Sequence, residues 1–161
     1  MALLNPSKRV LACGAFTLIE VLIVVAIVGI LAAISVNGFG AFATRSGADA
    51  SARVVLSALE EARARTLSAE GGTSYGVHFG STTVTVFAGE TYDAGDTSNE
   101  VRTLRRAEIS SVSLTGGANT IVFARLIGTA SATGTVTVVQ SVDATLSRTI
   151  TIHESGLSDV Q

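Results

Sequence analysis

The sequence has one cysteine, one proline and no tryptophan among its 161 residues. The single cysteine, Cys13, excludes an intrachain disulfide, although small exported domains often contain one. Aromatic residues make up only 5% of the chain. A domain of this size and composition buries a modest core with little margin. The fold must therefore be held together by packing alone.

Positive charge is also scarce. The chain has 11 Lys and Arg residues against 13 Asp and Glu residues, and its one lysine, Lys8, lies beside Arg9 near the N-terminus. If that N-terminal segment is removed, nine basic residues remain against 13 acidic ones, a net charge of −4. Broad nucleic-acid binding requires clustered cations that replace counterions. The composition therefore argues against nucleic acid as a partner, although Arg102, Arg105 and Arg106 form one small cluster.

The chain does contain one long apolar run, residues 15–34, with the sequence AFTLIEVLIVVAIVGILAAI. No charged residue occurs from Val21 to Thr44. A helix rises about 1.5 Å per residue, so that charge-free stretch would extend roughly 36 Å, enough to cross a bilayer core of about 30 Å. Because Lys8 and Arg9 precede the run, we expect a single pass with a cytoplasmic N-terminus.

Glu20 is the residue of this run that requires an explanation, since a carboxylate buried in a membrane helix costs on the order of a few kcal/mol. Phe16 and Glu20 are spaced i, i+4 and would share one helix face. If Phe16 were the N-terminal residue, its free amine could pair with Glu20 of the same chain. Alternatively, Glu20 could pair with the amine of a neighbouring subunit and set the stagger between packed helices, as buried polar groups set register in coiled coils.

The FTLIE motif, Phe16 to Glu20, resembles the N-terminus of type IV pilins and pseudopilins. In that family a prepilin peptidase removes a short basic leader after a small residue, usually Gly. The mature chain then begins with an aromatic residue and has Glu at position five. The resemblance implies a processing site at Gly14, Ala15 and Phe16, with N-methylation of Phe16 and assembly through Glu20. A cut after Ala15 keeps the Phe–Glu spacing, whereas a cut after Gly14 would make Glu20 the sixth residue.

The same resemblance implies partners and a location. The partners would be other pilins or pseudopilins, bound through the N-terminal helix, and the prepilin peptidase. The protein would lie in the inner membrane, with its C-terminal domain periplasmic or extracellular, before it enters a pilus or pseudopilus. No cofactor and no enzymatic activity are expected.

Two other export signals fit the N-terminus less well. A lipoprotein signal would end at Cys13, but only Val10 to Ala12 separate that residue from the basic leader, which is too short. An ordinary signal peptide would be cut after Ala43, in the Ala41-Phe42-Ala43 sequence, and would release a secreted soluble domain. Glu20 would interrupt the apolar region of such a signal.

We therefore divide the chain into a leader (1–15), a membrane and assembly helix (16–40), an amphipathic helix half (41–72) and a β domain (73–161). Between the two helix halves a glycine cluster, residues 37–47, predicts a point where the helix bends or partly melts, because glycine costs a helix about 1 kcal/mol relative to alanine. Gly71-Gly72 predicts the helix end. The residues expected on the apolar face of the second half are Ala52, Val55, Leu56, Leu59, Ala62 and Leu67.

After Gly72 the apolar period changes to two, which is typical of β-strands. Seven Val-, Ile- and Thr-rich segments separated by turn residues predict antiparallel sheets. The expected fold class is α+β and pilin-like, with a long N-terminal helix packed on the sheets. The predicted strands are 75–79, 83–88, 101–104, 111–114, 120–126, 135–140 and 147–153.

The part of the chain after the membrane helix has a second, looser resemblance. An amphipathic helix ends in Ala62-Arg63, a later strand contains Ile121 to Phe123 before Gly128, and the chain closes with a strand and a glycine, 149–156. This pattern is similar to the H-type minor pseudopilins of type II secretion and to the related T-type minor pilins. Some T-type pilins bind DNA through a C-terminal Gly-Arg-x-Arg segment, but this chain ends in GLSDVQ.

Three patterns that suggest chemistry have a simpler structural interpretation. Residues 72–76 match the GxSxG nucleophile elbow, but a helix precedes Ser74 and a strand follows it, which reverses the order that a hydrolase requires. His78 and His153 lack metal-ligand spacing. Major pseudopilins bind calcium in a loop, but the acidic loop here lacks EF-hand spacing, so we expect a solvated loop. Its candidate ligands are Asp93, Asp96, Asn99 and Glu100.

The sequence thus predicts an H-type minor pseudopilin, a structural subunit of the periplasmic pseudopilus. The alternative within the family is a minor type IV pilin for pilus assembly, adhesion or DNA uptake. The alternative from another class is the secreted domain cut after Ala43.

Overall fold

The computed structural model describes the backbone of residues 17–161 and the side chains of residues 17–33 and 47–161. The predicted leader and the processing site at Gly14, Ala15 and Phe16 lie outside the described residues. The chain divides into two compact units that meet between Phe39 and Gly40. The strands and the buried core belong to the second unit.

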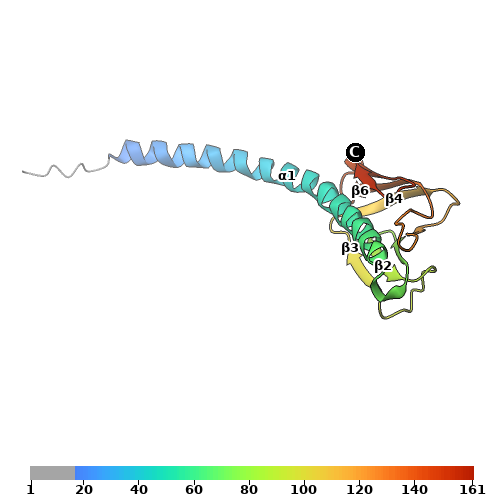
Figure 1. Cartoon of the computed structure of the whole chain (residues 1–161). Coiled ribbons are helices and arrows are strands. Elements are labelled where there is room, and N and C mark those ends of the chain that lie inside the picture. Colours follow the sequence, from blue (N-terminus) through green and yellow to red (C-terminus); the bar gives the residue numbers. More distant parts are fainter. Residues whose placement is uncertain (1–16) are drawn as a thin grey trace, which may run out of the picture. The chain divides into compact units, whose positions relative to one another are not determined.

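One helix, α1, spans Leu18–Leu67 (Figure 1). Its backbone is helical through the glycine cluster at 37–47, so the predicted partial melting is not observed. Strong helix formers (Ala, Leu, Glu and Arg) dominate its last turns. The helix ends before the predicted glycines, because Ala69 adopts a left-handed conformation with φ of 52°. A short 3₁₀ helix, η1, then spans Glu70–Gly72 and carries the glycines.

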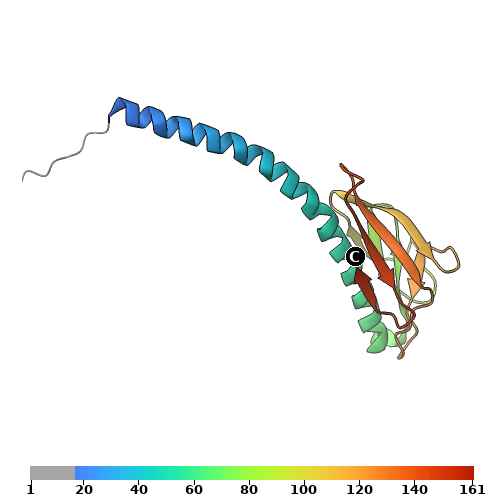
Figure 2. The ribbon, with the colours of Figure 1, turned by 90° about the horizontal axis from the view of Figure 1, so that it is seen from above.

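In the part of the chain that the structure describes, eight strands form two four-stranded antiparallel sheets. Figures 1 and 2 show how these sheets are arranged. This arrangement confirms the α+β class. Sheet A has the order β3-β2-β1-β5, and sheet B has the order β4-β6-β7-β8. The strands of sheet A are β1 (Tyr75–Phe79), β2 (Thr83–Ala88), β3 (Glu100–Thr103) and β5 (Thr120–Val122). Those of sheet B are β4 (Ala107–Leu114), β6 (Gly134–Gln140), β7 (Ser147–Ile152) and β8 (Ser158–Val160).

The core lies where the second part of α1 packs on both sheets. The helix contributes mostly small side chains, which let its backbone approach the strands closely. Each sheet contributes β-branched and aromatic side chains, as a pleated inner face requires. The buried helix residues include Ala52, Val55, Ala58, Leu59 and Ala62, the sheet A residues include Val77, Phe79, Val86, Ile121 and Phe123, and the sheet B residues include Val136, Val138, Ile150 and Ile152.

The position of Leu67 was predicted wrongly. Leu67 is 38% exposed, and the buried position beside it belongs to Thr66. The Thr66 hydroxyl donates to the Ala62 carbonyl at 2.8 Å and accepts from the Tyr75 backbone N–H at 2.9 Å. Burial of a hydroxyl costs little free energy when the group both donates and accepts a hydrogen bond in the folded protein. Thr66 thereby joins the end of α1 to the first strand of sheet A.

We expect the fragment 44–161 to fold alone, because the second unit contains the whole of the core described above. Circular dichroism should show more strand than helix, since the fragment keeps all eight strands and only the latter part of α1. Cooperative thermal unfolding without any disulfide should accompany that spectrum. A mainly helical or disordered fragment would contradict this expectation.

Candidate functional site: the N-terminal part of the helix

Glu20 lies in the first turn of α1, where the backbone geometry explains its local role. Its N–H donates to the Thr17 carbonyl at 3.1 Å and to the Thr17 hydroxyl at 3.3 Å. Thr17 therefore caps the helix, and Glu20 stands three residues later, as in a capping box. The positive end of the helix dipole also favours a carboxylate in this turn. Sequence reasoning missed this capping role, although the Thr-x-x-Glu spacing was a usable signal.

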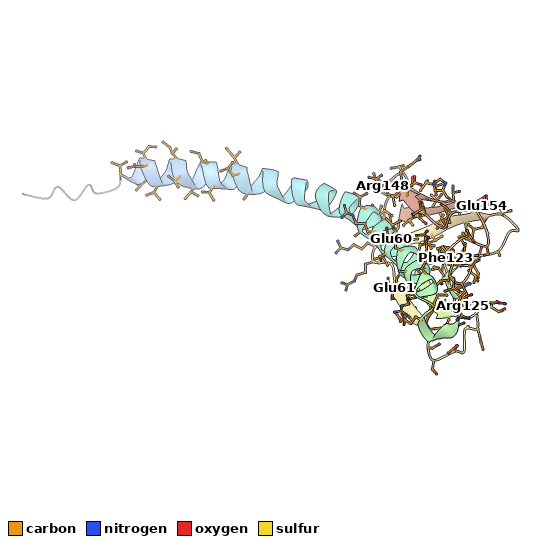
Figure 3. The ribbon with its side chains drawn as sticks, in the orientation of Figure 1. Glu60, Glu61, Phe123, Arg125, Arg148 and Glu154 are labelled. Atoms are coloured by element: carbon orange, nitrogen blue, oxygen red, sulfur yellow. The ribbon has the colours of Figure 1, made fainter. Side chains whose placement is uncertain are left out.

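Among the described residues, the apolar side chains that follow Glu20 are exposed. Every large aliphatic residue from Leu18 to Leu31 is at least 50% exposed, and Leu18 reaches 83% (Figure 3). They lie all round the helix, whereas a helix on a globular domain carries a single apolar stripe. An exposed apolar surface of this extent marks a site of contact with protein or membrane.

No helix in the described part of the chain is long and apolar enough to cross a membrane. The predicted membrane and assembly helix, 16–40, includes Phe16 and the side chains of residues 34–40, which lie outside the described residues.

The comparison with known families finds one match, and it covers Thr17 and Glu20. The sequence model of the prokaryotic N-terminal methylation motif matches residues 11–36. The chain therefore carries the signature of type IV pilins and pseudopilins. The matched segment supports prepilin peptidase cleavage and methylation, and it covers only residues 11–36 of the 161. No curated protein and no solved structure matches the chain. The H-type assignment thus receives no support from relatives.

The four candidate calcium ligands engage partners within the protein. Asp93 accepts from the Gly95 N–H at 2.9 Å, and its carbonyl accepts from the Asn99 amide at 2.7 Å. Asp96 accepts from the Ser98 N–H and hydroxyl, and these bonds lower the pKa of Asp96. In the part of the chain that the structure describes, no group of three or more His, Cys, Asp or Glu side chains could hold a metal ion. The loop is built by local turns.

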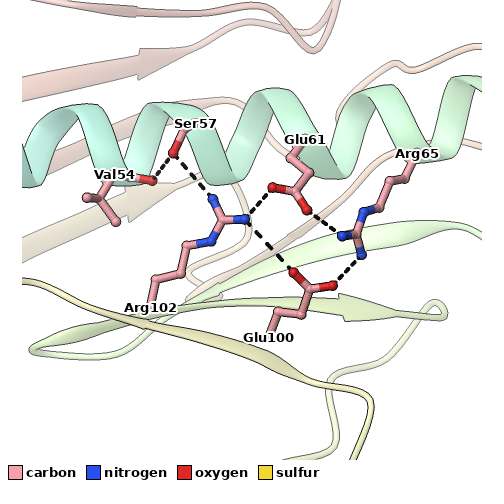
Figure 4. Close-up of polar contacts among 6 residues, drawn as sticks. All are labelled: Val54, Ser57, Glu61, Arg65, Glu100 and Arg102. Atoms are coloured by element: carbon pink, nitrogen blue, oxygen red, sulfur yellow. Dashed lines mark hydrogen bonds and ion pairs between the residues drawn. The ribbon is translucent and has the colours of Figure 1, made fainter.

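Glu100, the fourth candidate, belongs to an ion-pair network between α1 and β3 (Figure 4). Arg65 bonds Glu100 at 2.6 Å and Glu61 at 2.5 Å, and Arg102 pairs with Glu61. These carboxylates raise the pKa of Arg65, with Glu100 the largest contributor. The network also engages Arg102, so the basic cluster of the sequence is not a patch of three free cations.

The nucleophile-elbow pattern at 72–76 is a turn between η1 and β1. The expected order, helix before Ser74 and strand after it, is confirmed. His153, which follows β7, bonds Asp159 of β8 at 2.7 Å. Ser74 directly precedes β1 of sheet A. The serine of the elbow pattern and this His–Asp pair therefore belong to different sheets.

His78 has a role that its sequence position did not reveal. Its ring stacks on Tyr92 from the acidic loop, with centroids 4.0 Å apart, and its Nδ1 lies 3.0 Å from the Thr120 hydroxyl. Phe87 meets Tyr92 edge-on. The absence of a side chain at Gly76 makes room for the Phe87 ring, since a Cβ there would clash with that ring. The loop is thus anchored on the outer face of sheet A.

We expect the stability of fragment 44–161 to fall as the pH is lowered from 7 to 5. Burial lowers the pKa of His78 below its ordinary value of about 6.5. Below that pH the unfolded chain binds a proton that the folded chain resists, so protonation favours unfolding; above it, His78 is neutral in both states. Urea unfolding at several pH values gives the free energy of unfolding as a function of pH. The slope of this dependence should be smaller for His78→Gln than for the wild type.

A matched His153→Gln variant should keep the pH dependence of the free energy of unfolding that His78 causes. Hydrogen bonds lower the pKa values of Asp96 and Asp143, so protonation of these two groups changes the stability only below about pH 4. A slope between pH 5 and 7 that is unchanged in His78→Gln would contradict the assignment.

Proposed function

We propose that this protein is an H-type minor pseudopilin of a type II secretion system. The observation that carries the proposal is the methylation motif at residues 11–36, followed by an α1 surface that is apolar all round. After removal of 1–15 and methylation of Phe16, that surface would lie in the inner membrane and then in a bundle of like helices. The C-terminal unit would stand on the periplasmic side.

Assembly would depend on the charge of Glu20. In a lone subunit in lipid, Glu20 could pair with the amine of its own Phe16. In the pseudopilus the same carboxylate would pair with the amine of a neighbouring subunit, because water no longer solvates either group. The capping geometry supports this role, since hydrogen bonds from Glu20 N–H to Thr17 define where the helix begins and hold this residue in its first turn.

The C-terminal unit, hereafter the β unit, supports the proposal that this subunit makes specific contacts. It has no disulfide, and its helix and sheets are joined by the buried core and by the Glu61–Arg65–Glu100–Arg102 network. A C-terminal unit with its own core suits a subunit near the tip of the pseudopilus. Co-purification with type II secretion subunits would support this assignment, and recovery with pilus subunits alone would favour the minor pilin.

Mass spectrometry of protein extracted from membranes tests the processing step. We expect a chain that begins at Phe16 and carries one added methyl group. A Phe16 start with the leader removed also requires the peptidase, so a strain that lacks the peptidase should retain residues 1–15. A chain that begins at Thr44 would overturn the proposal and favour the secreted domain.

A further inference from the structure

A pocket of about 660 Å³ opens beside the outer face of sheet A, which makes it a ligand-sized cavity. Its walls come from four segments. Ser74 and His78 come from β1 and the residue before it, and Glu90 to Tyr92 come from the anchored loop. The other two segments are 120–124, which contains β5, and 129–131, which lies beside β5. The loop and sheet are joined by the His78–Tyr92 stack, so this wall of the pocket is preformed.

The lining carries unused hydrogen-bonding capacity. Among the described residues, the hydroxyls of Ser74, Thr91, Tyr92 and Thr129 make no side-chain hydrogen bond, and neither does the Glu90 carboxylate. Between these groups lie apolar surfaces from Val122 and Ala130. The pocket therefore has a polar rim and an apolar floor, as ligand sites do.

The charge of the lining restricts the ligand. Among the described residues that line the pocket, Glu90 is the one acidic residue, and none is Lys or Arg. Phosphates, nucleic acids and acidic sugars would meet the Glu90 carboxylate without a compensating cation. His78 does not supply one at neutral pH, because burial lowers its pKa. The site therefore disfavours anionic ligands, and its one carboxylate can accept hydrogen bonds from the hydroxyls of an uncharged ligand.

The neighbouring strand edge argues against an extended peptide. A peptide that binds by strand addition needs a free row of backbone groups. Beside β5 those groups are already used, because the Ala124 N–H donates to the Thr129 carbonyl and the Ser131 N–H donates to the Val122 carbonyl, both at 2.8 Å. Recognition must then come from side chains rather than from backbone pairing.

We propose that this pocket binds a neutral sugar unit of a glycan. A pyranose ring presents hydroxyls around its edge and C–H groups on its faces. The free hydroxyls and Glu90 would bond the edge, and the aromatic and aliphatic surfaces would pack against a face. This activity goes beyond assembly, and it would give the exposed unit a contact with carbohydrate outside the membrane.

The test uses the full chain in a detergent without a sugar head group, since maltosides and glucosides would compete for the site. Cellotetraose and chitotetraose are titrated separately by calorimetry, and a neutral Ser- and Gly-rich hexapeptide serves as the comparison ligand. Preference for chitotetraose would point to N-acetylated envelope glycans, and preference for cellotetraose would point to unacetylated polysaccharides. Either preference supports the proposal.

Variants locate the binding. Glu90→Gln removes an exposed charge, should leave the fold intact and should weaken binding about tenfold, as expected for loss of a charge-assisted hydrogen bond. Tyr92→Phe keeps the ring stack and should weaken binding severalfold. Glu108→Gln, on exposed β4, is the matched control and should bind like the wild type.

Absence of saturable binding to both oligosaccharides would overturn the proposal. So would equal binding by wild type, Glu90→Gln and Tyr92→Phe, or tighter binding of the hexapeptide. The measurement uses unassembled protein, so its result is independent of the pseudopilin assignment.

Discussion

Replacement of Glu20 by glutamine is expected to leave membrane insertion intact and to abolish incorporation into the filament. Glutamine serves at the third position of a capping box as glutamate does, so the helix start at Thr17 should survive. It cannot neutralise the amine of a neighbouring subunit. Insertion should be equal or better, because the substitution removes a carboxylate from the apolar segment.

The expected loss of incorporation into the filament is large. Breaking a buried ion pair by removal of one partner typically costs about 3–5 kcal/mol, since the other charge stays buried. Every 1.4 kcal/mol changes an affinity about tenfold, so incorporation should fall by two to three orders of magnitude. The measurement is cross-linking or co-purification with partner subunits, normalised to the amount of protein in the membrane.

Two further variants separate charge from capping. Glu20→Ala removes the carboxylate but keeps the backbone N–H that bonds Thr17, and it should fail as Glu20→Gln does. Thr17→Ala removes the capping hydroxyl at a cost of about 1 kcal/mol but keeps the carboxylate, so it should still assemble. If Glu20→Gln assembles normally and Thr17→Ala does not, Glu20 acts only as a capping residue.

Replacement of Phe123 by alanine should cause the largest loss of stability in the β unit. Phe123 is fully buried, and it follows β5 at the point where its N–H bonds the Tyr75 carbonyl at 2.9 Å (Figure 3). Truncation of a buried phenylalanine costs about 3–5 kcal/mol. The free energy of unfolding of a domain of this size is about 5–15 kcal/mol in total. The melting temperature of fragment 44–161 should therefore fall by more than about 10 °C.

The matched control is Val142→Ala, at a side chain that is 83% exposed. Its free energy of unfolding should stay within about 0.5 kcal/mol of the wild type. Urea unfolding measures both variants, and an unchanged m-value would show that Phe123→Ala acts on the folded state. If Phe123→Ala lowers the free energy of unfolding by less than 1 kcal/mol, the core repacks into the space that the ring leaves.

The sequence predicted the strands best where the period of two was strong and local. The bounds of β1 and β2 are those predicted, 75–79 and 83–88. The predicted strand 120–126 ends at Val122, because a turn at 124–128 places Leu126 at φ of 66°. Strand β8 was missed, because three residues carry too little pattern and depend on pairing with β7.

Local signals alone determined the apolar N-terminal part of α1, the Phe16–Glu20 signature and the change from helix to strands after Gly72. Only the tertiary structure decided the order of strands in each sheet, the pairing of Glu100 with Arg65, and the meeting of His78, Tyr92 and Thr120 beside one pocket. The physical reason is separation along the chain. Capping and periodicity act within a few residues, whereas these contacts join segments that meet only when the helix and both sheets bury a common core.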